Sequence, residues 1–273
     1  MRQNYTIMEK QRYTYDYPHP AVTTDCVVFG FDGYELKILL IERGIEPFKG
    51  MWALPGGFIH MNETAEQCAQ RELQEETGLN LSYLKQFMTF SEVNRDPRER
   101  VISIAFYALA RKSDVKGGDD ATQAQWFALK EAPRLAFDHD YILRKAMETL
   151  REDIHFEPIG FDLLDSEFSM PELQRLYEAI LGIQFDRRNF QKKMLQTGII
   201  EETEEVETVF FGQNREMRSM SIDSLFGDET RKSPCPTSNE SSSRTTRRWG
   251  TKFRFNKRRY DKFKEGNNFR LEF

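Results

Sequence analysis

The segment 57–79 constrains the fold of this chain more tightly than any other part of the sequence. Thr64 and Gln67 have the spacing of a capping box, in which each side chain satisfies the backbone amide of the other, so a helix is expected to begin at Ala65. Gly78 stands where a residue in the left-handed conformation would end that helix. The segment therefore predicts a glycine-containing loop followed by one capped helix that is rich in carboxylates.

Three glutamates of this helix, Glu72, Glu75 and Glu76, do not follow its polar face. At about 100° per residue, the glutamines form that face, whereas Glu72 and Glu76 fall within the arc of the apolar residues and Glu75 lies at its edge. Carboxylates that are turned toward the body of a domain repel one another unless a cation lies among them, and Mg²⁺ or Mn²⁺ takes oxygen ligands of this kind. The alternative is an acidic surface patch that pairs with Arg71 and nearby lysines, but the complete spacing favours a metal site.

This spacing resembles the signature of the Nudix hydrolases at every defined position. The matching residues are Gly57, Glu63, Arg71, Glu72, Leu73, Glu75, Glu76, Gly78 and Leu79. The resemblance implies an α/β/α sandwich with a mixed sheet, in which a metal-activated water attacks a diphosphate. It implies four metal ligands: the carbonyl of Gly57 and the carboxylates of Glu72, Glu75 and Glu76. It also implies that Arg71, counted with these glutamates among the catalytic residues, pairs with Glu63.

The substrate is expected to bind beside this helix. The Gly56-Gly57 turn allows close approach to phosphates, and Glu92 and Glu99 are candidates for the general base, or are simply exposed loop acids. Three further residues would line the pocket with guanidinium groups, or belong to a solvated loop: Arg95, Arg98 and Arg100. The expected ligand is a nucleoside diphosphate linked to another group, such as ADP-ribose.

Residues 21–156 predict one α/β domain after an N-terminal extension over residues 1–20. Runs rich in Val, Thr, Ile and Phe predict strands, and Asp32-Gly33 between the first two runs is a hairpin signal. The expected strands are 22–31, 36–41, 84–91, 101–110 and 125–129, with a second helix over 141–151. Strands mixed with two main helices favour a sheet covered by helices. His139 is expected to be a structural histidine at the start of the second helix.

The second half predicts a helix-turn-helix. Ser169 and Glu172 form another capping box, and Gly182 ends the helix. After a short turn, a basic helix over 187–197 is expected to end at Gly198. This is the arrangement in which a recognition helix enters the major groove, although a basic helix can also be a solvated face. The residues expected to contact DNA are Arg187, Arg188, Asn189, Gln191, Lys192, Lys193 and, from a later strand, Arg254.

Two short strands, Ile199-Ile200 and Phe253-Arg254-Phe255, predict the wing of a winged-helix domain over 169–265, after a linker over 157–168. The insertion at about 203–248 is rich in Ser, Thr and Asn. We expect this insertion to be mobile, because it has too little apolar area to offset chain entropy. Residues 266–273 would form a tail.

Charge and cysteine content narrow the class of protein. The net charge of −5 argues against a protein that coats nucleic acid, yet residues 244–264 hold ten Lys and Arg against one acid, Asp261. Three scattered cysteines predict neither a disulfide framework nor a thiolate zinc site. No apolar run reaches the length of a membrane span, so a cytoplasmic protein without a membrane partner is expected.

The two halves together are similar to the Nudix-related transcriptional regulators of bacteria. The segments that carry this similarity are 52–58, 135–140, 171–182 and 186–190. The resemblance implies a homodimer that binds double-stranded operator DNA and senses a small nucleotide or sugar ligand. Many such regulators have a damaged Nudix signature, whereas this one is intact, so we expect hydrolysis to persist. Two alternatives remain open: a plain Nudix pyrophosphohydrolase whose C-terminal module serves dimerisation, and a repressor that senses its ligand without cleaving it.

Overall fold

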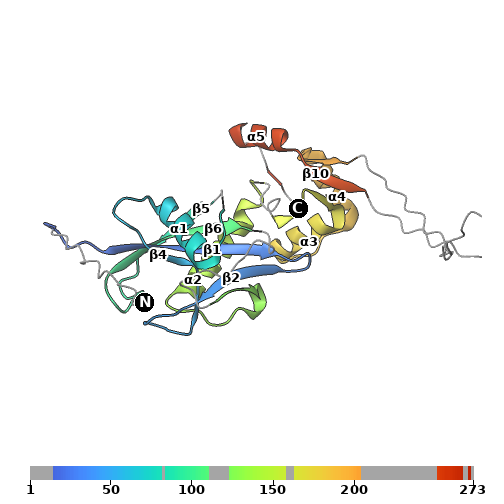
Figure 1. Cartoon of the computed structure of the whole chain (residues 1–273). Helices are drawn as coiled ribbons and strands as arrows, with labels where there is room; N and C mark the ends of the chain where they lie inside the picture. Colours follow the sequence, from blue (N-terminus) through green and yellow to red (C-terminus); the bar gives the residue numbers. More distant parts are fainter. Residues whose placement is uncertain are drawn as a thin grey trace, which may run out of the picture.

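The computed structural model describes residues 15–81, 84–110, 123–157, 163–203, 251–266 and 270–271. It contains a seven-stranded sheet flanked by helices and, beyond one end of that sheet, a smaller unit of helices with a three-stranded sheet (Figure 1). No helix in these ranges is long and apolar enough to cross a membrane.

The large sheet is mixed and is built around β1. Its strands are β1 (Ala21–Phe31), β2 (Leu36–Glu42), β3 (Trp52–Ala53), β4 (Gly56–Phe58), β5 (Lys85–Phe90), β6 (Val101–Leu109) and β7 (Ala124–Ala128). The order is β3-β2-β1-β6-β5, with β4 on β1 and β7 on β2. Strand β1 runs antiparallel to β2 and β4 and parallel to β6. The predicted strands are therefore confirmed to within two residues at each end.

Side chains that alternate along β1 divide the core into two layers. Cys26 and Val28 share a buried cluster with α1 (Ala65–Thr77), whereas Val27 and Phe29 share another with α2 (His139–Asp153). All four of these side chains are fully buried, and burying one the size of Val or Phe contributes roughly 1.5–3 kcal/mol. The predicted α/β/α sandwich is confirmed.

The smaller unit is a winged helix. Its elements are β8 (Glu167–Ser169), α3 (Met170–Leu181), α4 (Arg187–Thr197), β9 (Ile200–Glu202), β10 (Lys252–Phe255) and α5 (Lys257–Gly266). The strand order is β8-β10-β9, and both pairings are antiparallel. Helices α3 and α4 begin at capping residues Ser169 and Asp186, and left-handed glycines Gly182 and Gly198 follow them, as the sequence predicts.

Two parts of this unit differ from the expectation. The predicted linker 157–168 includes the start of β8, whose hydrogen-bond partners on β10 lie more than eighty positions later in the chain. Local sequence patterns do not report such distant pairing. The basic residues after β10 form the helix α5, where we expected only the end of the wing. The predicted insertion at 203–248 lies outside the described residues except for Thr203.

The winged helix packs directly on the Nudix-like half. One buried apolar cluster includes Phe29 of β1, Leu150 of α2 and Leu173 of α3. Two arginines add hydrogen bonds across the junction: Arg175 Nε donates to the Gly33 carbonyl at 2.8 Å, and Arg151 Nε donates to the Ile180 carbonyl at 3.0 Å. Figure 1 shows α3 beside the hairpin that joins β1 to β2, with α4, β10 and α5 beyond it.

Candidate functional site

A cavity of about 490 Å³ opens between β1, β4, α1 and the start of α2. Gly57, Glu72, Glu75 and Glu76, the four predicted metal ligands, all line it. The cavity also brings in residues from the β2–β3 loop and from the loop before β6, so separate segments of the chain shape one site.

The helix α1 is held in place by the caps that the sequence predicts. Gln67 N donates to Thr64 Oγ1 at 3.2 Å, and Thr64 N donates to Gln67 Oε1 at 2.8 Å. Gly78 closes the helix with a φ of 72°. The caps set where α1 begins and ends, and its packing on β4 and β1 determines which of its faces points at the cavity.

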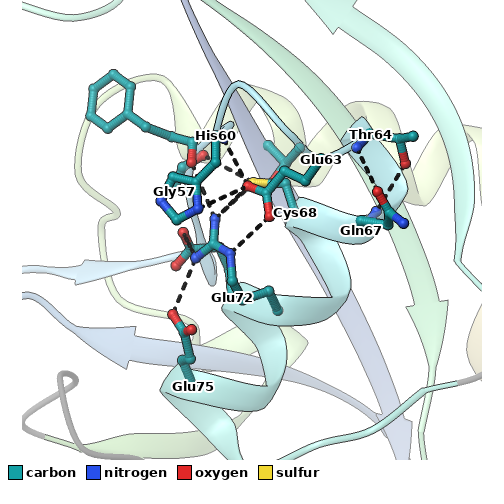
Figure 2. A network of polar contacts seen from close by, with 11 residues as sticks. Gly57, His60, Glu63, Thr64, Gln67, Cys68, Glu72 and Glu75 are labelled. Atoms are coloured by element: carbon teal, nitrogen blue, oxygen red, sulfur yellow. Dashed lines mark hydrogen bonds and ion pairs between the residues drawn. The ribbon is translucent and has the colours of Figure 1, made fainter. Parts of the chain in front are cut away.

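Arg71 connects three acids, Glu63, Glu72 and Glu75, all of which are labelled in Figure 2. Its Nε and Nη2 donate to the two carboxylate oxygens of Glu63 at 3.0 and 2.7 Å, which confirms the predicted pair. Its Nη1 donates to Glu72 at 2.7 Å and to Glu75 at 3.1 Å. The hydrogen bonds from Arg71 lower the pKa of Glu63 to about 2, and those from Glu63 raise the pKa of Arg71. This network orders the loop before α1 against the helix.

The glutamates of the site differ in exposure. Burial raises the pKa of Glu76 to about 8, although Gly56 N donates to its carboxylate at 2.9 Å. Burial also raises the pKa of Glu72, whose side chain is 14% exposed. Glu75 is 53% exposed and is held by Arg71. The carboxylates of Glu72 and Glu76 therefore ionise more readily when a positive charge lies beside them.

Gly56 and Gly57 bring the backbone close to these acids. A Cβ on Gly56 would lie 2.0 Å from the Thr24 carbonyl oxygen, and the φ of Gly56 is 155°. A Cβ on Gly57 would lie 2.2 Å from Glu72 Oε1. Gly56 therefore cannot carry a side chain, whereas a Cβ on Gly57 would displace the Glu72 carboxylate. With both residues glycine, the backbone at Gly57 stays open to a ligand.

The donor set fits a hard divalent cation, because it consists of carboxylates and a carbonyl facing one cavity. As the side chains stand, no three His, Cys, Asp or Glu residues within the described ranges are close enough together to hold a metal ion. We expected the three glutamates to converge; instead Arg71 Nη1 lies between Glu72 and Glu75. Glu75 would join the other ligands only if its side chain turned away from Arg71, which its exposure permits.

The three arginines predicted to bind substrate have different surroundings. Arg95 is buried and pairs with Asp25 at 3.0 Å and Asp138 at 2.7 Å, so it joins β1 to the start of α2 although it lines the cavity. Arg98 lines the cavity, pairs with Asp96 at 2.7 Å and lies over aromatic rings. Arg100 is not among the lining residues and donates to backbone carbonyls of its own loop. Its surroundings give it a structural role there.

Arg43, to which the sequence patterns did not point, lines the same cavity. Its guanidinium lies 4.7 Å from the centre of the Phe137 ring, which Arg98 also approaches at 5.6 Å. Among the described residues no carboxylate pairs with Arg43; its hydrogen bonds go to the carbonyls of Pro47 and Ile45. Burial lowers the pKa of Arg43. A cation without an anionic partner beside the glutamates is suited to a phosphate group, and nothing in the local sequence indicated that it faces them.

His139 is a buried structural residue, as expected. Its Nδ1 accepts from Leu54 N at 3.0 Å, and its Nε2 lies 3.5 Å from Asp25. Burial lowers the pKa of His139, so the ring is neutral and can act as an acceptor. The candidate bases Glu92 and Glu99 are both exposed and lie outside the cavity lining.

Helix α4 presents its basic residues to solvent. A shallow surface depression follows one face of the helix from its first to its last turn, and its lining residues are Arg188, Gln191, Lys192, Leu195 and Gln196. Arg187 and Asn189 are also exposed, whereas Lys193 is half-buried. Arg254 on β10 pairs with Glu201 at 2.6 Å. The predicted DNA contacts therefore divide into an open face of α4 and an ion-paired residue on the wing.

Each half of the chain matches a known domain family. Residues 19–148 match the NUDIX domain family, and residues 160–214 match the NrtR DNA-binding winged helix domain. The chain is 34% identical over 195 residues to the ADPR responsive transcriptional repressor NtrR of Acinetobacter baylyi, a match that covers 70% of this chain and 78% of that protein. It is 44% identical over 131 residues to the ADP-ribose pyrophosphatase of Methanocaldococcus jannaschii, covering 48% of this chain and 75% of that protein.

Solved structures resemble both halves together. The crystal structure of Shewanella oneidensis NrtR complexed with a 27mer DNA has a TM-score of 0.60 and 30% identity, covering 67% of this chain and 85% of that chain. A MutT/nudix family protein from Enterococcus faecalis has a TM-score of 0.63 and 31% identity, covering 71% of this chain and 86% of that chain. Nudix hydrolases generally use divalent metal ions, in keeping with the donor set described above. This chain therefore belongs to the NrtR-type Nudix proteins, in which a Nudix domain is followed by a DNA-binding winged helix domain.

Proposed function

We propose that this protein is a repressor that senses ADP-ribose in its Nudix cavity, binds operator DNA as a homodimer through the winged helix, and retains Mg²⁺-dependent hydrolysis of its ligand. Two relatives support the ligand: one is described as an ADPR responsive repressor and the other as an ADP-ribose pyrophosphatase. The shared chemistry is a diphosphate that joins two larger groups.

The observation that carries the enzymatic part is that Gly57, Glu72, Glu75 and Glu76 line a single cavity. These residues would hold the metal ion, which when bound activates water and offsets charge on the diphosphate. Arg71 holds Glu63 and Glu72 in position, and the Arg43 guanidinium faces the same space to bind a phosphate. Mn²⁺ has the same ligand preference and is the alternative ion.

Hydrolysis is tested by incubating purified protein with ADP-ribose and MgCl₂ and measuring released AMP. We expect Glu72→Gln and Glu75→Gln each to lower kcat by about a hundred-fold or more, because even the outer partners of a metal site are worth roughly 10–100-fold. Glu66→Gln is the matched control, since Glu66 is an exposed glutamate at the start of the same helix. If the wild-type protein releases no AMP, the proposed hydrolysis is wrong and the protein is a repressor that binds its ligand without cleaving it.

DNA binding is tested by mobility shift with the DNA upstream of the gene that encodes this chain. We expect Arg188→Ala combined with Lys192→Ala to abolish sequence-selective binding, since both residues lie on the open face of α4. Adding ADP-ribose should change the affinity for this DNA, and by linkage DNA should change the affinity for ADP-ribose equally. Sedimentation of the complex tests the dimer. No binding to any duplex would favour the alternative of a plain Nudix hydrolase.

A further inference from the structure

Helix α5 is the last element of the winged-helix unit and lies outside the match to the NrtR winged helix domain, which ends at residue 214. From its position and charge we propose that α5 is a second DNA-binding element, which contacts the phosphate backbone beside the groove that α4 enters. This inference rests on the proposed DNA-binding function and adds a surface that the recognition helix does not supply.

The first turn of α5 is fixed to the C-terminal end of α4. Asn256 begins the connection, because its N–H donates to the Ile199 carbonyl at 2.7 Å and its side chain accepts from Arg259 N at 3.1 Å. Arg259 Nη1 then donates to the carbonyl of Gly198, the residue that caps α4, at 3.2 Å. Arg259 is packed so closely there that a Cβ on Gly198 would lie 1.9 Å from its Nη1. These contacts fix the position of the first turn of α5 relative to the end of α4.

The far end of α5 leads back to the Nudix domain. Leu271 is buried in the apolar cluster that joins the two halves. Its N–H donates to the His155 carbonyl at 2.7 Å, and its carbonyl lies 2.9 Å from His155 Nδ1. Both the start of α5 and the chain beyond it are thus anchored, which reduces the entropy cost when α5 binds a partner.

The exposed residues of α5 suit a polyanion. Lys257, Arg258 and Lys262 are exposed, and no ion pair is formed by them among the described residues. They fall within an arc of about 140° on the helix, and by position this arc also contains two acids, Glu265 and the exposed Asp261. Three cations against two acids leave the arc with a net positive charge, in a chain whose overall charge is −5.

The length of α4 would bring the start of α5 to the edge of the groove. The open face of α4 runs from Arg188 to Gln196, a rise of about 12 Å at 1.5 Å per residue. The major groove of B-DNA is also about 12 Å wide. A helix that spans the groove therefore ends near the phosphates that border it, and α5 begins at that end. Contacts to phosphates position a protein on DNA but do not read its sequence.

The test compares salt dependence in full-length variants. The triple variant Lys257→Ala, Arg258→Ala, Lys262→Ala is measured against wild type on a labelled duplex of mixed sequence and on the upstream DNA. We expect the plot of log affinity against log salt to become shallower by about 0.9 for each phosphate that the variant no longer neutralises, or about 2.7 for all three. Affinity should fall by a similar factor on both duplexes. Asp261→Asn should raise affinity on both.

The matched control removes the same charges from the Nudix surface: Lys49→Ala, Lys130→Ala, Arg134→Ala, three residues that are not buried. It should keep the wild-type slope. The inference is overturned if the α5 variant keeps the wild-type slope, or if it loses affinity only for the upstream DNA. Wild-type protein that binds neither duplex overturns the proposed DNA-binding function itself, so the two failures are distinguishable. Thermal melting confirms that each variant is folded.

Discussion

At the scale of single residues, the two neighbouring glycines before α1 have different roles. Gly56 needs its positive φ and touches backbone, so we expect Gly56→Ala to destabilise the fold by about 2–4 kcal/mol. Gly57 touches only the movable end of Glu72, so Gly57→Ala should leave the unfolding free energy nearly unchanged and lower Mn²⁺ affinity about 10–100-fold. Urea denaturation and Mn²⁺ titration measure the two effects. Equal destabilisation by both changes would contradict this division.

His139 predicts how stability depends on pH. Burial lowers the pKa of His139 in the folded protein. The charges of Arg95 and Arg43 lower it further, and the carboxylates of Asp25 and Asp138 act in the opposite direction. The unfolded chain therefore binds the proton first, so the contribution of His139 is complete above about pH 6.5 and is lost as pH falls below that value. His139→Asn keeps an acceptor for Leu54 N but does not titrate. Between pH 7.5 and pH 5 the unfolding free energy of wild type should fall more steeply than that of the variant; parallel curves would refute this.

Residue roles were predictable only where they depend on near neighbours. The Arg71–Glu63 pair follows from positions eight apart in one capped segment. Arg43 was missed because its place in the cavity depends on the Phe137 ring, almost a hundred positions later. Arg95 was interpreted as a substrate ligand because the sequence does not show that Asp25 and Asp138 surround it.

At the scale of elements, the capping boxes locate helices that the periodicity alone would leave uncertain. In α3, Ser169 N donates to Glu172 Oε2 at 2.7 Å, and Glu172 N donates to Ser169 Oγ at 3.4 Å. We expect Ser169→Ala to lower the unfolding free energy by about 1 kcal/mol, since the first amides of the helix lose their acceptor. Ser169→Asn should restore most of this loss in the same denaturation experiment. If Ser169→Asn is as unstable as Ser169→Ala, the serine has another role.

Elements that are stabilised by distant partners could not be located in this way. The helices α1, α3 and α4 carry their own start and stop signals, and the sequence located their ends closely. The three-residue strand β8 has no such signal and exists because β10 pairs with it. Helix α5 does carry a start signal, because Asn256 accepts from Arg259 N as an N-cap residue, and we overlooked it by interpreting the basic run as the end of the wing. Its attachment to the end of α4 through Arg259 could not be predicted from local sequence.

At the scale of the whole molecule, the apolar cluster that joins the two halves predicts one cooperative unfolding transition. Phe190 lies in the winged-helix core, and Leu150 lies in the Nudix half of the same cluster. We expect Phe190→Leu and Leu150→Val each to shift a single calorimetric transition, by about 2–4 °C per kcal/mol for a protein of this size. ADP-ribose at about a hundred times its Kd should raise the stability of the entire chain by about 2.7 kcal/mol. A second transition that only one substitution moves would contradict this picture.

The shared cluster also limits how such proteins can be recombined. In a C-terminal fragment that begins at residue 163, side chains such as Leu164 and Phe168, which are buried in the full chain, would be exposed to solvent. Such a fragment would tend to self-associate. An exchange of DNA-binding halves between relatives would fail for the same reason unless the facing residues of α2 and β2 were transferred with them. Substitutions on the exposed faces of the winged-helix helices can therefore change the contacts with DNA without disturbing the packing that joins the two domains.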